Sequence, residues 1–452
     1  MKRKIKKLVA SILVGVMTFS LVACGGSNAP ATEEPATEEP AAQESTAEPA
    51  AEEPAAESAS SDTTLTVAIW DSYQEPGLRT IMDDFTAETG IKAEIQVTPW
   101  GEYWTMLEAG ATGGNLPDVF WMHSNEIGTY AEYDMLLDLT DKIQADGVDL
   151  ANYPTDIVNL YKNANGSQLA LPKDIDTVGL WYNKTMFDEA GIDYPDNSWT
   201  WEQLADVAKQ LTKDDGSQYG MHMSPPEYHP GFFNTIYAYD GTILSDDKTK
   251  SGWDEPGTIE AMKLVEKMLK DGSMPPANTI AEVDPVALLT SGKIAMVGFG
   301  SWMITTLIEN EYVQEHCDIA VLPKGPSGNR PTIYNGLGWA AAENTDNPDE
   351  AWALIKYMTS EAAQKKQADL GVTMSAFKGV SDAFVNSNPD FNVQAYIDMM
   401  DDMVLLPYSK STVAWMNMMQ EKLVPVWEGS ADMEETCKSI AEEMNAMLAE
   451  EQ

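Results

Sequence analysis

Basic residues are scarce in this chain. Its 452 residues include 28 Lys and Arg against 72 Asp and Glu, which gives a formal net charge of −44 at pH 7. This balance excludes nucleic acid as a partner, because affinity for phosphates depends on clustered Lys and Arg. It also disfavours polyanionic ligands and fits an exported protein that binds a neutral or cationic ligand.

Cysteine and histidine are also rare. The four histidines do not fall in the spacing of a metal site, so neither a metal nor a cofactor is expected. The three cysteines are Cys24, Cys317 and Cys437. An oxidising compartment would permit a disulfide between Cys317 and Cys437. Two buried free thiols fit equally well, since the sequence gives no distance between them.

Catalytic patterns are missing as well. A Ser-Gly-Lys run at 291–293 lacks the earlier glycine and the following Ser or Thr of a phosphate-binding loop, so it indicates a helix-to-strand turn. No Gly-x-Ser-x-Gly elbow is present. A glycosidase-like carboxylate pair could be drawn, but with so many acids such pairs arise by chance. The acids available for one include Asp71, Glu75, Asp174 and Asp176.

No apolar run is long enough to span a bilayer. The run from Leu8 to Ala23 has 16 residues, short of the roughly 20 that a spanning helix needs. It follows a basic segment and ends in Leu-Val-Ala-Cys-Gly at 21–25, which indicates a lipoprotein signal peptide over 1–23. We expect Cys24 to carry a lipid that holds the protein at the outer face of the cell membrane. Removing the five basic residues lowers the net charge from −44 to −49.

The segment 24–62 is composed mainly of Ala, Glu, Pro, Ser and Thr. It has no aromatic or large aliphatic residue after Cys24, so it cannot bury enough apolar area to offset the entropy of ordering. We expect a disordered, extended acidic linker that separates the membrane anchor from a folded body.

The body begins with an alternation of strands and helices. Strand patterns at 65–70, 91–97 and 118–122 enclose helical patterns at 74–89 and 100–111. This order predicts a parallel sheet flanked by helices, with ligands bound beyond the carboxyl ends of the strands. A second α/β unit follows, and the C-terminal third is mostly helical by periodicity.

Tryptophans stand at or just beyond several predicted strands. An indole can stack on the apolar face of a sugar ring while neighbouring polar groups bind the hydroxyls. The alternative is core packing, since tryptophans are well buried on average. We favour the core for Trp121, inside an apolar run, and ligand contact for Trp70 and Trp302. Trp100 and Trp339 are the other two tryptophans at or just beyond predicted strands.

An ordered set of motifs resembles the extracellular solute-binding proteins of the sugar-binding class (family 1). The resemblance covers roughly residues 65–452. The motifs are Leu-Pro-Asp-Val-Phe at 116–120, Leu-Pro-Lys-Asp-Ile-Asp-Thr at 171–177, Trp-Tyr-Asn-Lys-Thr-Met-Phe at 181–187, Trp-Thr-Trp-Glu at 199–202, Ser-Gly-Lys-Ile-Ala-Met at 291–296, Gly-Ser-Trp at 300–302 and Asn-Pro-Asp-Glu-Ala-Trp at 347–352.

The resemblance implies a two-lobed α/β receptor, each lobe a mainly parallel sheet flanked by helices. It implies lobes at 63–174 with 324–372, and at 179–318 with 373–452, joined by a hinge of about three crossings. Such a receptor is a monomer that closes on a mono- or oligosaccharide and delivers it to the membrane subunits of an ABC importer. It is not an enzyme.

Several residue roles follow from the resemblance. Trp302 stands at the family's ring-stacking tryptophan, and Asp176 at an acidic acceptor of hydroxyl hydrogen bonds beside the hinge. Met122 replaces a stacking tryptophan, and His229 replaces a common acid; both departures weigh against maltose itself. The full set of expected ligand-binding residues is Trp70, Asp71, Trp100, His123, Asn125, Glu126, Asp176, Tyr228, His229, Trp302 and Trp339.

Two alternatives stay open at this point. A secreted glycoside-active enzyme would use a pair of the carboxylates. The same receptor fold could also bind a cationic solute such as a polyamine or a peptide, as the acidic charge permits.

Overall fold

A five-stranded sheet forms the core of the first lobe in the computed structural model, which describes residues 63–451. Strand β1 lies between β2 and β3 and is parallel to both, as the β-α-β-α-β pattern predicts. Strand β10 completes the sheet by pairing with β3 and β4. In sheet order the strands are β2 (Lys92–Val97), β1 (Thr64–Ile69), β3 (Val119–Met122), β10 (Gly338–Ala341) and β4 (Ala170–Pro172).

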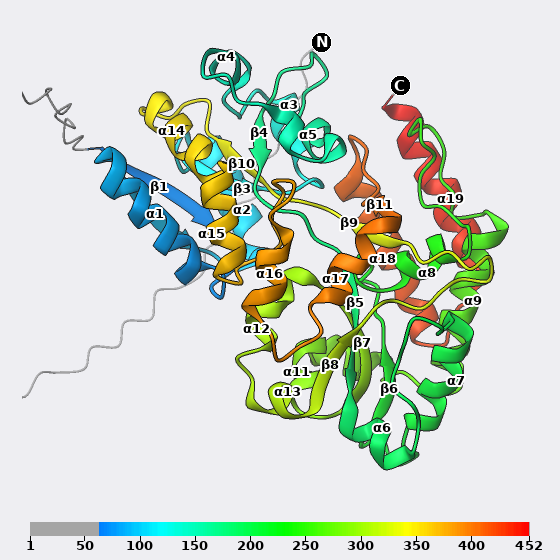
Figure 1. Ribbon diagram of the computed structural model, residues 1–452. Coiled ribbons are helices and arrows are strands. Elements are labelled where there is room, and N and C mark those ends of the chain that lie inside the picture. The colour runs from blue at the N-terminus through cyan, green and yellow to red at the C-terminus, as the bar shows by residue number, and fades with distance from the viewer. Residues whose placement is uncertain (1–62, 452) are drawn as a thin grey trace, which may run out of the picture. The chain divides into compact units, whose positions relative to one another are not determined.

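Helices cover the first sheet as the periodicity predicts. Helix α1 (Glu75–Thr89) packs against β2 and ends at Gly90, whose left-handed φ of 77° favours glycine. In Figure 1 the later helices α14 (Pro348–Met358) and α15 (Glu361–Asp369) lie beside α1, which brings part of the C-terminal third of the chain to this lobe. The lobe also contains α2 (Trp100–Gly113), α3 (Ile127–Glu132), α4 (Thr140–Ala145) and α5 (Thr155–Leu160).

A four-stranded sheet forms the core of the second lobe. Its two central strands, β5 (Val178–Asn183) and β7 (Ile294–Gly300), are buried at every position. Strands buried on both faces are mostly apolar along their length, without the alternation of a half-exposed strand. In sheet order the four strands are β6 (Tyr219–His222), β7, β5 and β8 (Cys317–Ala320).

The two lobes are α/β units with mainly parallel sheets, as expected, and in each sheet a single strand runs against all the others. Strand β10 is antiparallel to both of its neighbours, and β5 is antiparallel to β7 and β8. The cause lies in the connections between the lobes. Both β5 and β10 are entered from the other lobe, so they start at the edge of the sheet where neighbouring strands end.

The helices of the second lobe pack on its sheet and on one another. Thr200 caps helix α7 (Trp201–Leu211) by accepting from Gln203 N, as predicted. The Ser-Gly-Lys run joins helix α11 (Pro285–Thr290) to β7 as the expected turn. The remaining helices are α6 (Lys184–Ala190), α8 (Phe232–Ala238), α9 (Pro256–Lys270), α10 (Ala277–Glu282), α11 (Pro285–Thr290), α12 (Ile304–Leu307), α13 (Glu311–His316), α18 (Thr412–Trp427) and α19 (Met433–Glu450).

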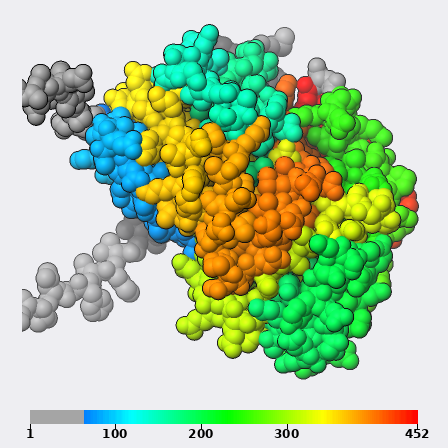
Figure 2. All heavy atoms as spheres, viewed as in Figure 1, coloured from blue at the N-terminus to red at the C-terminus, as the bar shows by residue number. Residues whose placement is uncertain are grey.

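The chain segments that pass between the lobes are bonded to one another. Asp176 N donates to Asn335 O at 2.9 Å, and Ile175 N donates to Met374 O at 3.3 Å. Strand β9 (Thr332–Tyr334), which directly precedes Asn335, pairs with β11 (Met403–Leu405) in a two-stranded sheet. In Figure 2 the orange segment, which includes α16 (Ser381–Ser387) and α17 (Gln394–Asp398), lies between the yellow and green parts of this face.

Cys317 and Cys437 are both buried free thiols, which decides between the two alternatives left open by the sequence. Burial raises the pKa of each thiol to about 12, so both stay protonated and unreactive at neutral pH. Within residues 63–451, no helix has the length and apolar character needed to cross a bilayer. The predicted signal peptide, Cys24 and the acidic linker lie outside the described residues.

Candidate functional site

A cavity of about 480 Å³ brings together most of the residues that the sequence singled out. It is lined from both lobes and from the segments between them. Its size lies in the range of small-ligand sites, which bury most of a small molecule. The predicted residues that line it are Trp70, Asp71, Trp100, His123, Asn125, Asp176, Tyr228, His229 and Trp302.

The first-lobe wall of the cavity is aromatic. Trp70 follows β1, and Trp100 opens α2 with 44% of its surface exposed. Their rings meet edge to face at 5.0 Å, and Trp100 lies 5.3 Å from the ring of His123. The rear of Trp70 packs on buried Trp121 at 4.8 Å. A buried ring therefore supports the exposed ones, which fixes the wall before a ligand arrives.

The opposite wall carries Trp302, just after β7. Its ring lies 5.0 Å from that of His229 and close over Gly300. A Cβ on Gly300 would come within 1.8 Å of the Trp302 ring, so only glycine leaves room for the ring in this position. An apolar ring from each lobe thus borders the same cavity.

Asp176 supplies a carboxylate at the segment between the lobes and is only 7% exposed. Its Oδ1 accepts from Asn335 N at 3.0 Å, and His229 Nε2 lies 3.5 Å from the same oxygen. No described residue donates to Oδ2. Asp176 lines the cavity, so Oδ2 is available to accept a hydrogen bond from a ligand.

His123 is neutral. Burial, with a contribution from the nearby charge of His229, lowers its pKa to about 3. Asn125 N donates to His123 Nδ1 at 3.1 Å, so the ring proton sits on Nε2. Asn335 Nδ2 lies 3.0 Å from that Nε2, while Asn335 Oδ1 is buried without a partner. Turning this amide by 180° lets Oδ1 accept from Nε2–H.

A direct hydrogen bond joins the two lobes across the cavity. Asn125 Nδ2, in the loop after β3, donates to the hydroxyl oxygen of Tyr228 at 3.2 Å. Burial raises the pKa of Tyr228 to about 12, so the hydroxyl keeps its proton. Asn125 Oδ1 has no partner and is buried, which leaves an acceptor at the point where the lobes meet.

Two predicted residues do not line the cavity. Trp339 lies within β10, is 0% exposed and packs against Trp121 at 6.0 Å, so this structure places it in the core and not at the cavity. Its neighbour Trp121 is core, as expected. Glu126 does not line the cavity, and burial, with a contribution from the charge of Glu108, raises its pKa to about 7.

Sequence reasoning missed several cavity residues. Gln74, at the start of α1, and Glu227, beside Tyr228, both line the cavity. Asp174 lines it too, although it appeared earlier only as one of many acids. Burial raises the pKa of both Asp174 and Glu227. The position of Asp174, two residues before Asp176 in the same motif, was the signal available to find it.

The chemistry of the cavity is that of binding. Its acids are Asp71, Asp174, Asp176 and Glu227, and neither Lys nor Arg lines it. Among the described residues, no group of His, Cys, Asp and Glu could hold a metal ion. Indole rings and carboxylates that line one cavity suit a ligand that has apolar faces and hydroxyl or amino donors.

Comparison with known proteins points the same way. The chain matches the model for bacterial extracellular solute-binding proteins over residues 71–365. A putative binding protein of Brucella abortus is 24% identical over 403 residues, which cover 86% of this chain and 94% of that protein. The galactooligosaccharide-binding protein of Bacillus subtilis is 24% identical over 401 residues, 83% of this chain and 82% of that protein.

Solved structures share the fold. An ABC substrate-binding protein of Listeria monocytogenes, in complex with cycloalternan, superposes with a TM-score of 0.79 at 22% identity. The alignment covers 86% of this chain and 100% of that one. The GacH receptor of Streptomyces glaucescens gives a TM-score of 0.75 at 19% identity, with coverage of 86% and 99%.

Proposed function

The chain belongs to the bacterial extracellular solute-binding proteins, and from this premise we propose that it is a lipid-anchored receptor for a mono- or oligosaccharide. In this proposal the sugar binds between the lobes, the lobes close on it, and the closed form delivers it to an ABC importer. The protein acts as a monomer at the outer face of the cell membrane. Relatives that are named for galactooligosaccharide and maltodextrin binding support the sugar class.

The observation that carries the proposal is the pairing of ring faces and carboxylates. Trp70 and Trp100 on one lobe and Trp302 on the other border one cavity with Asp176. A sugar ring presents apolar C–H faces to indoles and hydroxyl donors to carboxylates. A solute without apolar faces would leave the exposed surface of the Trp100 indole without an apolar contact from the ligand.

Closure follows from contacts on both sides. We place the lobes at 63–174 with 324–372, and at 179–318 with 373–452. A ligand that touches both lobes stabilises the closed form, because only that form gains both sets of contacts. The bond from Asn125 to Tyr228 would add to closure directly.

A thermal-shift screen tests the proposed ligand class. The panel contains maltotriose, a galactooligosaccharide, diacetylchitobiose and spermidine. A ligand that binds only the folded state raises the melting temperature by mass action, so at least one sugar should raise it in a concentration-dependent way. The absence of any shift with the sugars would contradict the proposal.

The polyamine in that panel represents a second candidate. The cavity is lined by four acids and by neither Lys nor Arg, which would suit a cationic solute. A shift with spermidine and none with the sugars would replace the sugar in the proposal with a cation.

Replacing Cys24 by alanine tests the anchor. The variant should appear in the culture medium instead of the membrane fraction, with its ligand-induced thermal shift unchanged. The reason is that the lipid would be attached to Cys24 alone, on a linker remote in sequence from the binding residues. Fractionation followed by immunoblotting measures the distribution; an unchanged membrane fraction would contradict lipidation at this residue. Ser27→Ala, in the same segment, is the matched control.

A further inference from the structure

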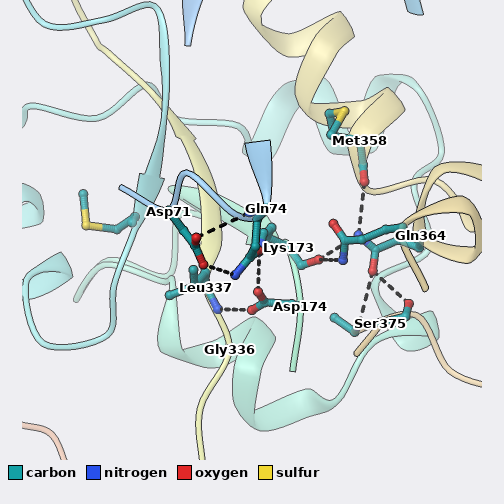
Figure 3. Close-up of polar contacts among 12 residues, drawn as sticks. Asp71, Gln74, Lys173, Asp174, Gly336, Leu337, Met358, Gln364 and Ser375 are labelled. Carbon is teal, nitrogen blue, oxygen red and sulfur yellow. Dashed lines mark hydrogen bonds and ion pairs between the residues drawn. The ribbon is translucent and has the colours of Figure 1, made fainter. Parts of the chain in front are cut away.

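Lys173 is a fully buried lysine that does not line the cavity. It is 0% exposed, although lysine is almost never fully buried unless it is paired. Its Nζ donates to Gln74 Oε1 and to Asp174 Oδ2, each at 2.6 Å. The same ammonium lies 4.2 Å from the ring centre of Trp121. The ammonium therefore binds two side chains that line the cavity, although Lys173 itself does not line it (Figure 3).

The ammonium fixes the orientation of the Gln74 side chain. Because an ammonium can only donate, Oε1 of Gln74 must face Lys173, and Nε2 must face the other way. That Nε2 donates to Asp71 Oδ2 at 2.9 Å. Asp71 Oδ1 accepts from the backbone N–H groups of Tyr73 at 2.8 Å and of Gln74 at 3.4 Å. Asp71 lines the cavity, so Lys173 is connected to this cavity carboxylate through the Gln74 side chain.

On its other side, Lys173 is tied to the segments that join the lobes. Asp174 accepts from Lys173 through Oδ2 and from Leu337 N through Oδ1, the latter at 2.7 Å. The carbonyl oxygen of Lys173 accepts from Gln364 Nε2 at 2.8 Å. Gln364 Oε1 in turn accepts from Ser375 Oγ at 2.9 Å. The connected chain thus runs from a cavity carboxylate to parts of the protein far apart in sequence (Figure 3).

We propose that Lys173 is a positioning residue of the binding site, which holds Asp71 in place through Gln74 and ties it to the inter-lobe segments. Its effect on ligand affinity rests on the proposed sugar-binding function, whereas its effect on Asp71 does not. Removing the ammonium frees the Gln74 amide to turn, and the carboxylate then loses its side-chain donor. The loop from 70 to 74 becomes looser as a result.

Hydrogen–deuterium exchange of the ligand-free protein measures this directly. Lys173→Met and Gln74→Leu should each speed exchange at the amides of Tyr73 and Gln74 by about fivefold or more. Exchange in β1 should stay as in the wild type. The double variant should exchange no faster than either single variant, because both changes break the same chain of hydrogen bonds. Lys267→Met, which removes an exposed ion pair of 2.7 Å with Asp206, is the matched control.

The outcomes separate the possibilities. Unchanged exchange at Tyr73 and Gln74 would overturn the proposal, as would an equal increase throughout β1, which would mark a general loss of stability. If Lys173→Met fails to fold, Gln74→Leu decides alone, since it leaves the ion pair with Asp174 in place. For each panel sugar that stabilises the wild type, Gln74→Leu should weaken affinity at least fivefold; if no sugar binds, the exchange result still stands.

Discussion

Replacing Trp339 by alanine is expected to lower the free energy of unfolding by about 3–5 kcal/mol, the usual cost of removing a large buried aromatic side chain. Trp339 is 0% exposed and packs on Trp121 in the middle of the first sheet. The cavity left behind cannot collapse easily, because strands lie on both sides of β10. Denaturant unfolding at equilibrium measures the change.

Trp100→Ala is the matched control, since it removes the same side chain where 44% of it is exposed. It should cost less than half as much stability. A Trp339→Ala protein that kept its stability but lost ligand affinity would contradict the core assignment and restore the role in binding expected from the sequence.

Trp302→Ala is expected to weaken sugar binding by about tenfold or more. Its ring borders the cavity from the second lobe, and truncating an aromatic residue at the centre of a binding site often costs about 2 kcal/mol. The fold should be little affected, because the ring lies at a cavity surface rather than in the core. Isothermal titration calorimetry with the panel sugar that gives the largest thermal shift measures the affinity.

Tyr133→Ala controls for removing an aromatic ring, because Tyr133 is 65% exposed and outside the cavity. Its affinity should equal that of the wild type. An unchanged affinity in Trp302→Ala would show that the second-lobe wall does not stack on the sugar, and the ligand would have to be held by the first lobe.

The local structure of the first lobe could be predicted from the sequence, because each element carries its own pattern. The helix expected over 74–89 is α1, with its apolar residues buried and Gly90 at its end. The directions of β5 and β10 could not be predicted in this way. They depend on where the chain enters each sheet after crossing from the other lobe, and no local pattern records that route.

The family resemblance predicted the overall fold and the class of protein, which local patterns alone did not. The match over residues 71–365 confirms it, and the neighbours of known structure confirm the two-lobed α/β fold. Because these relatives are binding proteins, the prediction that the chain is not an enzyme is also confirmed. The boundaries of the lobes and the roles of the individual residues stay predictions.

The candidate site was predicted best where a residue follows a strand. Trp70, Trp100 and His123 do so and line the cavity. Trp339 does not line the cavity, because it lies inside strand β10 and is 0% exposed. Lys173 was not singled out from the sequence, although it lies in the motif at 171–177. Its role depends on a glutamine about a hundred positions earlier in the chain, at the start of α1.

The placement of β10 has a consequence for how the newly made chain folds. This strand separates β3 from β4 in the first sheet, yet it is synthesised well over a hundred residues after either. During synthesis and export the N-terminal strands therefore emerge before β10, and the edges of β3 and β4 that β10 will occupy are unpaired. Unpaired edges invite aggregation, and such long-range pairings form slowly. The first lobe should thus depend on chaperones until residue 341 has emerged, while the second lobe can already assemble its four strands.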